Sequence, residues 1–352
     1  MGRKTKTQAL SAVAPIFSII VALLASALFV MWAKSMSVSE YFSALRLLLD
    51  IIITESLSTP QKFMEVLVYA TPLLFCGLAH IICFRCGLFN IGVEGQFIMG
   101  MVGGALIGQL QGVPMLLHIA LMVLAGIICG GLWGFLPGIL KAKRGTNEVV
   151  VCIMTNFIAM YISNYIALRS VFADSQHDSS YTIQPHAQLP RFVPTSRLNI
   201  SVFMAIILAF CVYLLLFWSK RGFQIRAVGL NASAAEAGGV NTTWNIVLAL
   251  VISGAIAGVG GALQISGVQT RLISMASFPN YGFDAIPVAL LCNKNPLACV
   301  LVAILFGALR NCSRMFQIEG IPKDIVYVIQ AIIIFFVAAD LITKHLNKRR
   351  RA

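Results

Sequence analysis

Charged residues are scarce in this chain of 352 residues. Only 11% are Asp, Glu, Lys or Arg, whereas 59% are hydrophobic, and the mean hydropathy is +0.87. Soluble domains contain roughly a quarter charged and about half apolar residues. A single water-soluble core of this length would leave too little polar surface to cover it. The composition therefore excludes an ordinary soluble protein and predicts an all-α membrane protein.

The sequence also lacks the motifs of the common hydrolases. It contains no Gly-Lys dipeptide, so the phosphate-binding Gly-x-x-x-x-Gly-Lys-[Ser/Thr] loop is absent. Neither His-Glu-x-x-His nor Gly-x-Ser-x-Gly occurs. We therefore expect that this chain is not an enzyme, does not hydrolyse ATP and holds no cofactor of its own.

Exposed cysteine and histidine clusters are missing as well. The nine cysteines lie almost wholly in apolar segments, where thiols behave as small hydrophobic groups. Cys83 and Cys86 form one Cys-x-x-Cys pair without the second ligand pair or strand–helix context that zinc or redox function needs. His80 and His118 stand alone in apolar runs and are expected to be packed or cavity-facing. We expect no metal site.

Apolar runs long enough to cross a bilayer recur along the chain. The first, residues 10–33, suits a retained anchor; small residues at 25–27 also suit a cleavable signal peptide, but the run continues through Trp32. The other runs cover residues 65–84, 95–112, 116–138, 149–168, 198–218, 244–265, 284–292, 296–312 and 325–343. The sequence thus predicts a polytopic transmembrane helical bundle with about ten segments, some of them short or broken.

These runs form one predicted transmembrane domain over residues 1–352. Residues 1–60 are expected to hold the anchor helix and an amphipathic segment lying on the outer surface, whose apolar face contains Phe42, Leu45, Leu48 and Leu49 at helical spacing. Residues 61–343 are the predicted core, and residues 344–352 are a basic tail.

The distribution of positive charge predicts the topology. Arg3, Lys4 and Lys6 precede the first run, and threading from an inner N-terminus places 16 of the 26 Lys and Arg residues inside. Nine of the 13 acidic residues fall outside. Because inner loops collect Lys and Arg, both termini are predicted to be cytoplasmic. The net charge of +13 is then a determinant of topology, and nucleic acid is not expected as a partner.

The stretch from Cys86 to Gln96 is too polar for a helix that faces lipid. It contains three glycines together with Asn90, Glu94 and Gln96. Irregular backbone and charge at membrane depth are tolerated only where protein or a water-filled cavity satisfies them. We therefore predict a broken helix that lines a pathway, with Glu94 facing the cavity and accepting hydrogen bonds from backbone or from a solute hydroxyl. A cytoplasmic turn with a solvated Glu94 is the alternative.

Three further polar residues are candidates for the pathway. Asn147 suits the N-cap of a helix that opens at Glu148, and it is equally a candidate for solute contact. Asn156 lies inside a span, where amides pair across helices or face a pore. Asp284 is predicted to cap the short crossing, whose positive end suits an electron-rich solute or a plain re-entrant turn.

Glycines and two long loops complete the pattern. The glycines at 100–108 and 254–261 are spaced for close helix packing and do not form a nucleotide fingerprint. The hydrophilic loops at 169–197 and 219–243 are longer than simple connectors, so we expect both to bind something, with a solvated linker as the alternative.

Four segments, in order, resemble the permease family of simple-sugar, nucleoside and branched-chain amino acid ABC importers, closest to the nucleoside branch. They are residues 87–96, 144–149, 226–231 and 282–290, and the resemblance covers roughly residues 60–340. It implies a multi-pass permease subunit in the bacterial inner membrane that forms a pathway for nucleosides or a related small polar solute. Riboflavin and simple sugars are alternative substrates, and an ion-coupled secondary transporter is the alternative of another class.

The resemblance also implies partners. These are a cytoplasmic ABC ATPase that binds ATP, a homologous or identical second permease subunit, an extracytoplasmic substrate-binding lipoprotein and membrane lipid. The residues that resemble the ATPase-coupling segment are Arg226, Gly229, Asn231, Glu236 and Gly239. A short helix capped by Asn231 and stopped by Gly238 and Gly239 is expected there.

Overall fold

The computed structural model describes residues 20–174, 176–322, 324–332 and 335. Almost all of its secondary structure is helical, which confirms the all-α prediction. Three features of the sequence analysis lie outside the described residues. They are the basic residues Arg3, Lys4 and Lys6, the basic tail at 344–352 and most of the last apolar run.

The described elements follow one another with short connections, except around the loop after α6. In chain order they are η1 Val38–Glu40, α2 Tyr41–Leu57, α3 Pro60–Arg85, α4 Val93–Gly108, α5 Met115–Arg144, α6 Glu148–Arg169, β1 Ala173–Asp174, β2 Ser179–Ser180, η2 Pro185–Ala187, α7 Ser201–Trp218, α8 Lys220–Leu230, α9 Ala232–Ala237, α10 Thr242–Gln264, η3 Ile265–Gln269, α11 Tyr281–Leu291 and α12 Pro296–Ile318. Residues 20–33 and 325–332 are also helical. The antiparallel strands β1 and β2 form a small hairpin, and η3 is a π-helical turn.

Within the described part of the chain, six helices are long and apolar enough to cross a membrane: α3, α5, α6, α7, α10 with η3, and α12. Three shorter apolar helices are Ile20–Ala33, α4 and α11. Together they coincide with nine of the ten predicted runs. The protein is therefore a multi-pass membrane protein. The prediction of about ten segments, which counts the shorter helices as crossings, stays a prediction.

The chain folds into two compact units. One comprises residues 70–303 and holds all the candidate pathway and coupling residues. The other joins the segment up to Tyr69 with the segment from Ile304 onward. The predicted domain boundaries at residues 60 and 343 stay a prediction.

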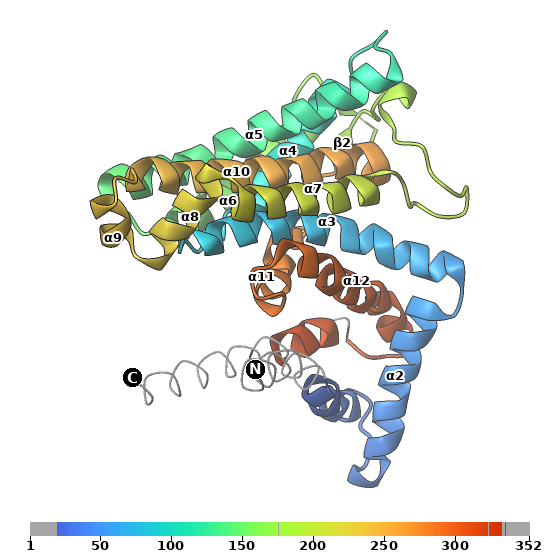
Figure 1. Cartoon of the computed structure of the whole chain (residues 1–352). Coiled ribbons are helices and arrows are strands. Elements are labelled where there is room, and N and C mark those ends of the chain that lie inside the picture. Colours follow the sequence, from blue (N-terminus) through green and yellow to red (C-terminus); the bar gives the residue numbers. More distant parts are fainter. Residues whose placement is uncertain (1–19, 175, 323, 333–334, 336–352) are drawn as a thin grey trace, which may run out of the picture. The chain divides into compact units, whose positions relative to one another are not determined.

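In the larger unit, helix α4 packs closely against α5 and α10 (Figure 1). Glycines make the approach possible, because a Cβ atom at Gly258 would collide with the carbonyl oxygen of Gly126 and one at Gly100 would collide with Gly258. Almost every residue of α4 is buried, as expected for a helix that is apolar all round. The predicted tight packing of the glycine segments is confirmed.

Local capping explains where several helices of this unit begin and end. Asn147 Oδ1 accepts a hydrogen bond from Val149 N (3.0 Å) at the start of α6, as predicted. Ser219 and Asn241 cap α8 and α10 in the same way. Helix α5 ends at Gly145, whose φ of 64° suits glycine.

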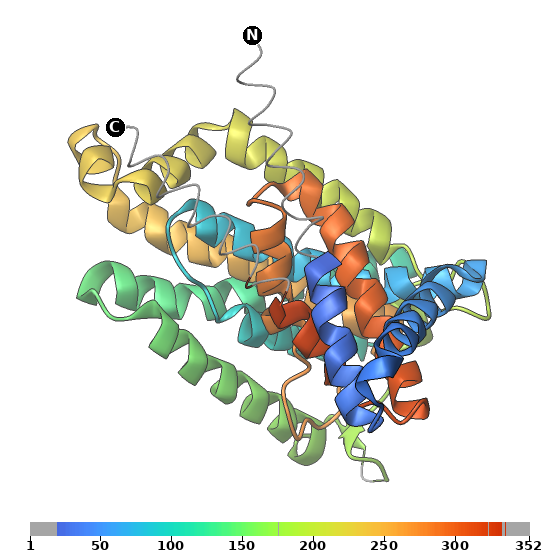
Figure 2. The ribbon, with the colours of Figure 1, turned by 90° about the horizontal axis from the view of Figure 1, so that it is seen from below.

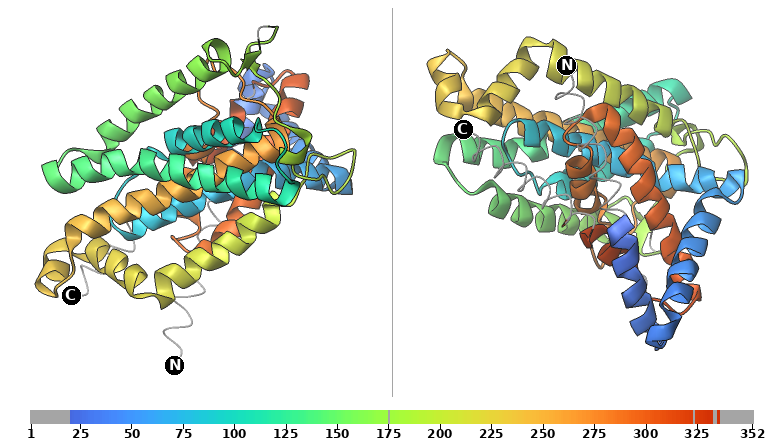
Figure 3. Two further views of the ribbon diagram at one scale, coloured as in Figure 1. Left: turned by 90° about the horizontal axis from the view of Figure 1, so that it is seen from above. Right: turned by 60° about the horizontal axis from the view of Figure 1, so that its bottom comes forward.

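The loops predicted to lie inside meet at one end of the larger unit. Arg85 donates two hydrogen bonds to the carbonyl oxygen of Lys294 (3.0 and 2.8 Å). The guanidinium groups of Arg85 and Arg226 each lie 5.2 Å from the centroid of the Phe217 ring. The short helices α8 and α9 lie at this end, beyond α7 and α10 (Figure 3). Burial and then the positive charge of Arg85 lower the pKa of Lys294.

The loops predicted to lie outside meet at the opposite end. Gln184 N donates to the carbonyl oxygen of Gly108 (2.8 Å), and Leu189 N donates to Ser266 O (2.9 Å). The two ends of the unit therefore carry different sets of loops, as alternate threading requires.

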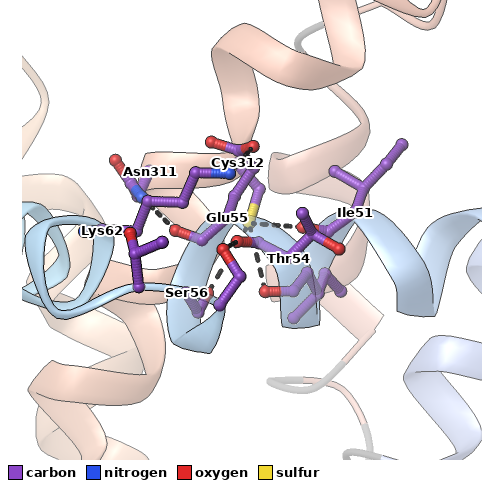
Figure 4. Close-up of polar contacts among 10 residues, drawn as sticks. Ile51, Thr54, Glu55, Ser56, Lys62, Asn311 and Cys312 are labelled. Atoms are coloured by element: carbon purple, nitrogen blue, oxygen red, sulfur yellow. Dashed lines mark hydrogen bonds and ion pairs between the residues drawn. The ribbon is translucent and has the colours of Figure 1, made fainter.

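The smaller unit is held by polar contacts around the end of α2 (Figure 4). Lys62 Nζ forms an ion pair with Glu55 (2.8 Å), and Asn311 Nδ2 donates to Glu55 O (2.7 Å). Helix α2 buries Leu48 and exposes 78% of Phe42, so the predicted amphipathic helix is present, although Phe42 does not belong to its buried face.

Candidate functional site

The side chain of Asn90 holds together the non-helical residues 86–92 between α3 and α4. Its Nδ2 donates to Ser253 Oγ of α10 (2.9 Å) and to Gln96 Oε1 of α4 (3.1 Å). Its Oδ1 accepts from Gly92 N (3.0 Å) and from Cys152 Sγ of α6 (3.4 Å). Asn90 and Gln96 are almost fully buried. The break predicted at this point is confirmed, and its polar side chains join three helices.

Glu94 caps a neighbouring helix. Its carboxylate accepts hydrogen bonds from the backbone nitrogens of Asn280 (2.7 Å), Gly282 and Phe283 (3.3 Å), where α11 begins. Glu94 is completely buried. A carboxylate suits this place because the first amides of a helix lack partners and carry partial positive charge. Glu94 is therefore not solvated, as the alternative required, and its carboxylate is directed at backbone. That Glu94 faces a pathway stays a prediction.

The start of α11 differs from the prediction. The helix begins at Tyr281, after Asn280 in a left-handed conformation (φ 64°). Asp284 lies inside the first turn instead of at the N-cap, and it is 7% exposed. The capping carboxylate comes from Glu94, 188 residues before Gly282, which local sequence could not indicate.

Two amides of α6 fasten two non-helical stretches. Asn156 Oδ1 accepts from Gly95 N (2.8 Å) while its Nδ2 donates to Ile91 O (3.0 Å). In the same way, Asn164 Oδ1 accepts from Met275 N (2.7 Å) and Asn164 Nδ2 donates to Met275 O (2.8 Å). Each amide thus replaces the backbone pairing that an irregular stretch lacks. Asn156 pairs across helices, which is one of the two arrangements predicted for it.

The other candidate, Asn147, lies apart from this network. It is exposed at the surface end of α6 and serves as the helix cap described above. The structure therefore brings together Asn90, Glu94, Gln96 and Asn156, with Asp284 on the helix that Glu94 caps. Their part in transport stays a prediction.

The predicted coupling segment has the expected form. Helix α9 is capped by Asn231, whose Oδ1 accepts from Ala234 N (3.0 Å), and it ends at Gly238. Gly239 follows with a φ of 81°, and Glu236 is exposed. The capping and stop signals read from the sequence are confirmed.

Gly229 connects this segment to the break. A Cβ atom on Gly229 would collide with the carbonyl oxygen of Arg85 and approach Gly87 N to 2.8 Å. Gly87 itself has a φ of 76°. The end of α8 therefore rests on the backbone that leads from α3 to Asn90.

The long hydrophilic loop at 169–197 packs against the residues that follow η3. Ser180 N donates to Leu272 O (2.8 Å) and Ile183 N to Thr270 O (2.9 Å). Hydrogen bonds from Gln176 N and His177 lower the pKa of Asp174 in the hairpin. This loop is therefore a packed cover over the π-turn η3.

Sequence reasoning missed the connection between η3 and α11, residues 270–280. With Met101 and Gln269 it lines a cavity of about 310 Å³. Its serines, Ser274 and Ser277, are ordinary turn residues, and no local motif distinguishes them. The only available signal was the length of chain between two apolar runs.

Comparison with known proteins agrees with the resemblance read from the sequence. The family model described as "Branched-chain amino acid transport system / permease component" matches residues 63–338. The guanosine ABC transporter permease protein NupP of Bacillus subtilis is 36% identical over 333 residues, or 93% of this chain and 92% of its own.

Two further relatives extend this range. The nucleoside ABC transporter permease protein NupB of Lactococcus lactis is 31% identical over 307 residues, 84% of each chain. The glucose ABC transporter permease protein TsgB13 of Haloferax volcanii is 30% identical over 317 residues, 86% of this chain and 81% of its own. All three carry the name of permease proteins.

Proposed function

Because the chain belongs to the family of branched-chain amino acid transport system permease components, we propose that it forms the membrane pathway of an ATP-driven importer of nucleosides. The observation that carries the proposal is the alignment with the guanosine and nucleoside permeases over at least 84% of both chains. The protein spans the bacterial inner membrane with cytoplasmic termini in this proposal. The same membership disfavours an ion-coupled secondary transporter.

The partners are those that such an importer requires. A cytoplasmic ATPase binds and hydrolyses ATP, a second permease subunit completes the pathway, and an extracytoplasmic lipoprotein delivers the solute. The ATPase docks on α8 and α9 through the coupling residues Arg226, Gly229, Asn231, Glu236 and Gly239.

The packing of α8 supports a route for this coupling. Gly229 contacts the backbone of residues 85–87, which continues to Asn90 and then to Glu94. Glu94 in turn holds the start of α11. A displacement of α8 and α9 by the ATPase would move this connected set as one body and alternate the access of the pathway.

Reconstituted transport tests the proposal. The complex is placed in proteoliposomes with its lipoprotein, and uptake of labelled guanosine is measured with native ATPase and with an ATPase variant that binds but does not hydrolyse ATP. Uptake is expected only with the native ATPase. Uptake that continues at the native rate with the inactive ATPase contradicts the proposal.

The docking assignment has its own test. Glu236→Arg reverses an exposed charge on α9 and is expected to lower the amount of ATPase that co-purifies by about tenfold, since reversing a charge within an interface disrupts its electrostatic complementarity. Asp50→Arg, an exposed reversal on α2, is the matched control and should retain the ATPase. Equal co-purification of both variants would place the docking surface elsewhere.

A sugar is the second candidate substrate, favoured by the 30% identity with the glucose permease. Competition separates the two. An excess of unlabelled guanosine should abolish uptake of labelled guanosine, while an excess of glucose should leave it unchanged. The opposite pattern with labelled glucose would assign the importer to sugars.

A further inference from the structure

The connection from Thr270 to Asn280 runs along the whole length of α4. At one end Thr270 O accepts from Ile183 N, next to Gln184, which donates to Gly108 O at the end of α4. At the other end Asn280 N donates to Glu94 at the start of α4. Since an α-helix rises about 1.5 Å per residue, these two points lie about 21 Å apart.

This connection is ordered although most of it is neither helix nor strand (Figure 2). Asn164 fastens Met275 from α6, and Ser274 N donates to Asp178 O (3.0 Å). Met275 and Phe278 pack against Ile98 of α4 and Met160 of α6. Thr270 (φ 58°) and Asn280 (φ 64°) are left-handed, so two strained residues bound the connection.

Irregular backbone beside a membrane-embedded helix needs protein or water to satisfy it. Here part of the stretch is open, because Ala276 and Ser277 are exposed and the cavity of about 310 Å³ lies against it. That volume is at the lower end of the range for small-molecule sites, about 300–1,000 Å³.

The walls of the cavity are uncharged. The polar groups are Gln269, Ser274 and Ser277, and the aromatic group is Phe278, which packs against Phe157 with ring centroids 5.0 Å apart. Arg271, the one charged residue of the connection, does not line the cavity.

Gln269 supplies the feature that points to a ligand. It ends the π-turn η3, and such turns occur frequently at functional sites. Its Oε1 atom is buried and has no hydrogen-bond partner among the described residues. A buried acceptor without a partner is costly. Gln269 is only partly buried and lines the cavity, so a rotation of its amide that brings Oε1 to a donor in the cavity relieves this cost.

We propose that this cavity is a binding site along the solute passage and that it takes an uncharged nucleoside. A donor group of the solute bonds to Gln269 Oε1, its hydroxyls bond to Ser274 and Ser277, and its base packs against Phe278. The inference rests on the proposed function. Phosphorylated nucleosides and zwitterionic amino acids are excluded, because no wall residue compensates their charge.

Accessibility tests the passage without requiring transport. In the full complex with Cys211→Ser, which removes the exposed native thiol, Ser277→Cys should react with a charged, water-soluble thiol reagent. Ile207→Cys, an exposed position near the middle of α7, is the matched control and should be at least tenfold slower because lipid covers it. Equal rates at the two positions overturn the passage.

Binding measured without the lipoprotein tests the recognition, because the lipoprotein would otherwise set the KM and the competition. For the purified complex of permease and ATPase, Gln269→Leu should raise the Kd for guanosine about tenfold, the effect of one hydrogen bond of about 1.4 kcal/mol, and guanosine monophosphate should not compete with guanosine for the native complex. An unchanged Kd, or competition by the monophosphate, overturns the site. If native proteoliposomes take up no guanosine at all, the proposed function fails, and the thiol rates still decide whether residues 270–280 line a passage.

Discussion

Two non-helical stretches of the larger unit, residues 86–92 and 270–280, satisfy their irregular backbone in different ways. Both are fastened by an amide of α6, Asn156 in the first case and Asn164 in the second. The polar side chains around the first stretch are buried and engaged with protein. The second exposes Ser277 and borders a cavity. The polar residues around the first stretch therefore form hydrogen bonds that hold the backbone in place, whereas some of those in the second stretch face open space.

The difference also concerns what glycine is needed for. Just after the first stretch, in the first turn of α4, a Cβ atom on Gly95 would come within 2.7 Å of Asn156 Oδ1, so the amide can reach the backbone there only over glycine. The second stretch contains no glycine between Thr270 and Asn280, and its side chains take up the space beside α4. A glycine-rich polar motif thus indicates close contact, while an open passage requires room for side chains and solute.

The largest effect that would separate the two roles is expected at Glu94. Glu94→Ala leaves three amides at the start of α11 without their acceptor, at about 1–3 kcal/mol for each buried group. Folded complex should be almost lost and uptake should fall to background. The measurement is the yield and melting temperature of the purified complex together with uptake.

Glu94→Gln is the matched control, because it keeps one acceptor oxygen at nearly the same volume and should retain part of the stability. A Glu94→Ala complex of native melting temperature that fails only in uptake would show that the carboxylate acts on solute, and the contrast between the stretches would disappear.

A smaller effect should distinguish the two amides of α6. Asn156→Leu strands Gly95 N and Ile91 O in a buried place, at about 1–3 kcal/mol each. Asn164→Leu frees the backbone of Met275, which is only partly buried, so water can replace the amide. The melting temperature should fall more for Asn156→Leu, while Asn164→Leu should mainly raise the Kd for guanosine of the complex purified without its lipoprotein. Equal losses of stability, or the reverse order, would contradict this division.

The sequence could predict those features that depend on neighbouring residues. The cap of α6 at Asn147, the cap of α9 at Asn231 and the stop at Gly238 all involve partners within a few residues. The apolar runs located the spanning helices for the same reason. Local patterns are sufficient where the unpaired backbone groups of a helix end are capped by residues only a few positions away.

Contacts between distant residues could not be predicted in this way. The amides capped by Glu94 lie more than 180 residues further on, and Gly229 meets Arg85 across the fold. The polarity at residues 86–96 showed that something satisfies this backbone, without showing whether it was protein or water. The cavity at 273–279 depends on how that stretch lies along α4, and its sequence is unremarkable.

The smallest expected effect belongs to Asn147, the candidate that lies outside the buried network. Asn147→Ala removes the hydrogen bond to Val149 N, and the loss of an N-cap costs about 0.5–2 kcal/mol. The melting temperature should fall slightly, while the Kd for guanosine of the complex purified without its lipoprotein stays unchanged. Asn147→Asp, which keeps the acceptor, should restore the melting temperature. A changed Kd at native stability would instead make Asn147 a contact of the solute, because a cap acts on the helix alone.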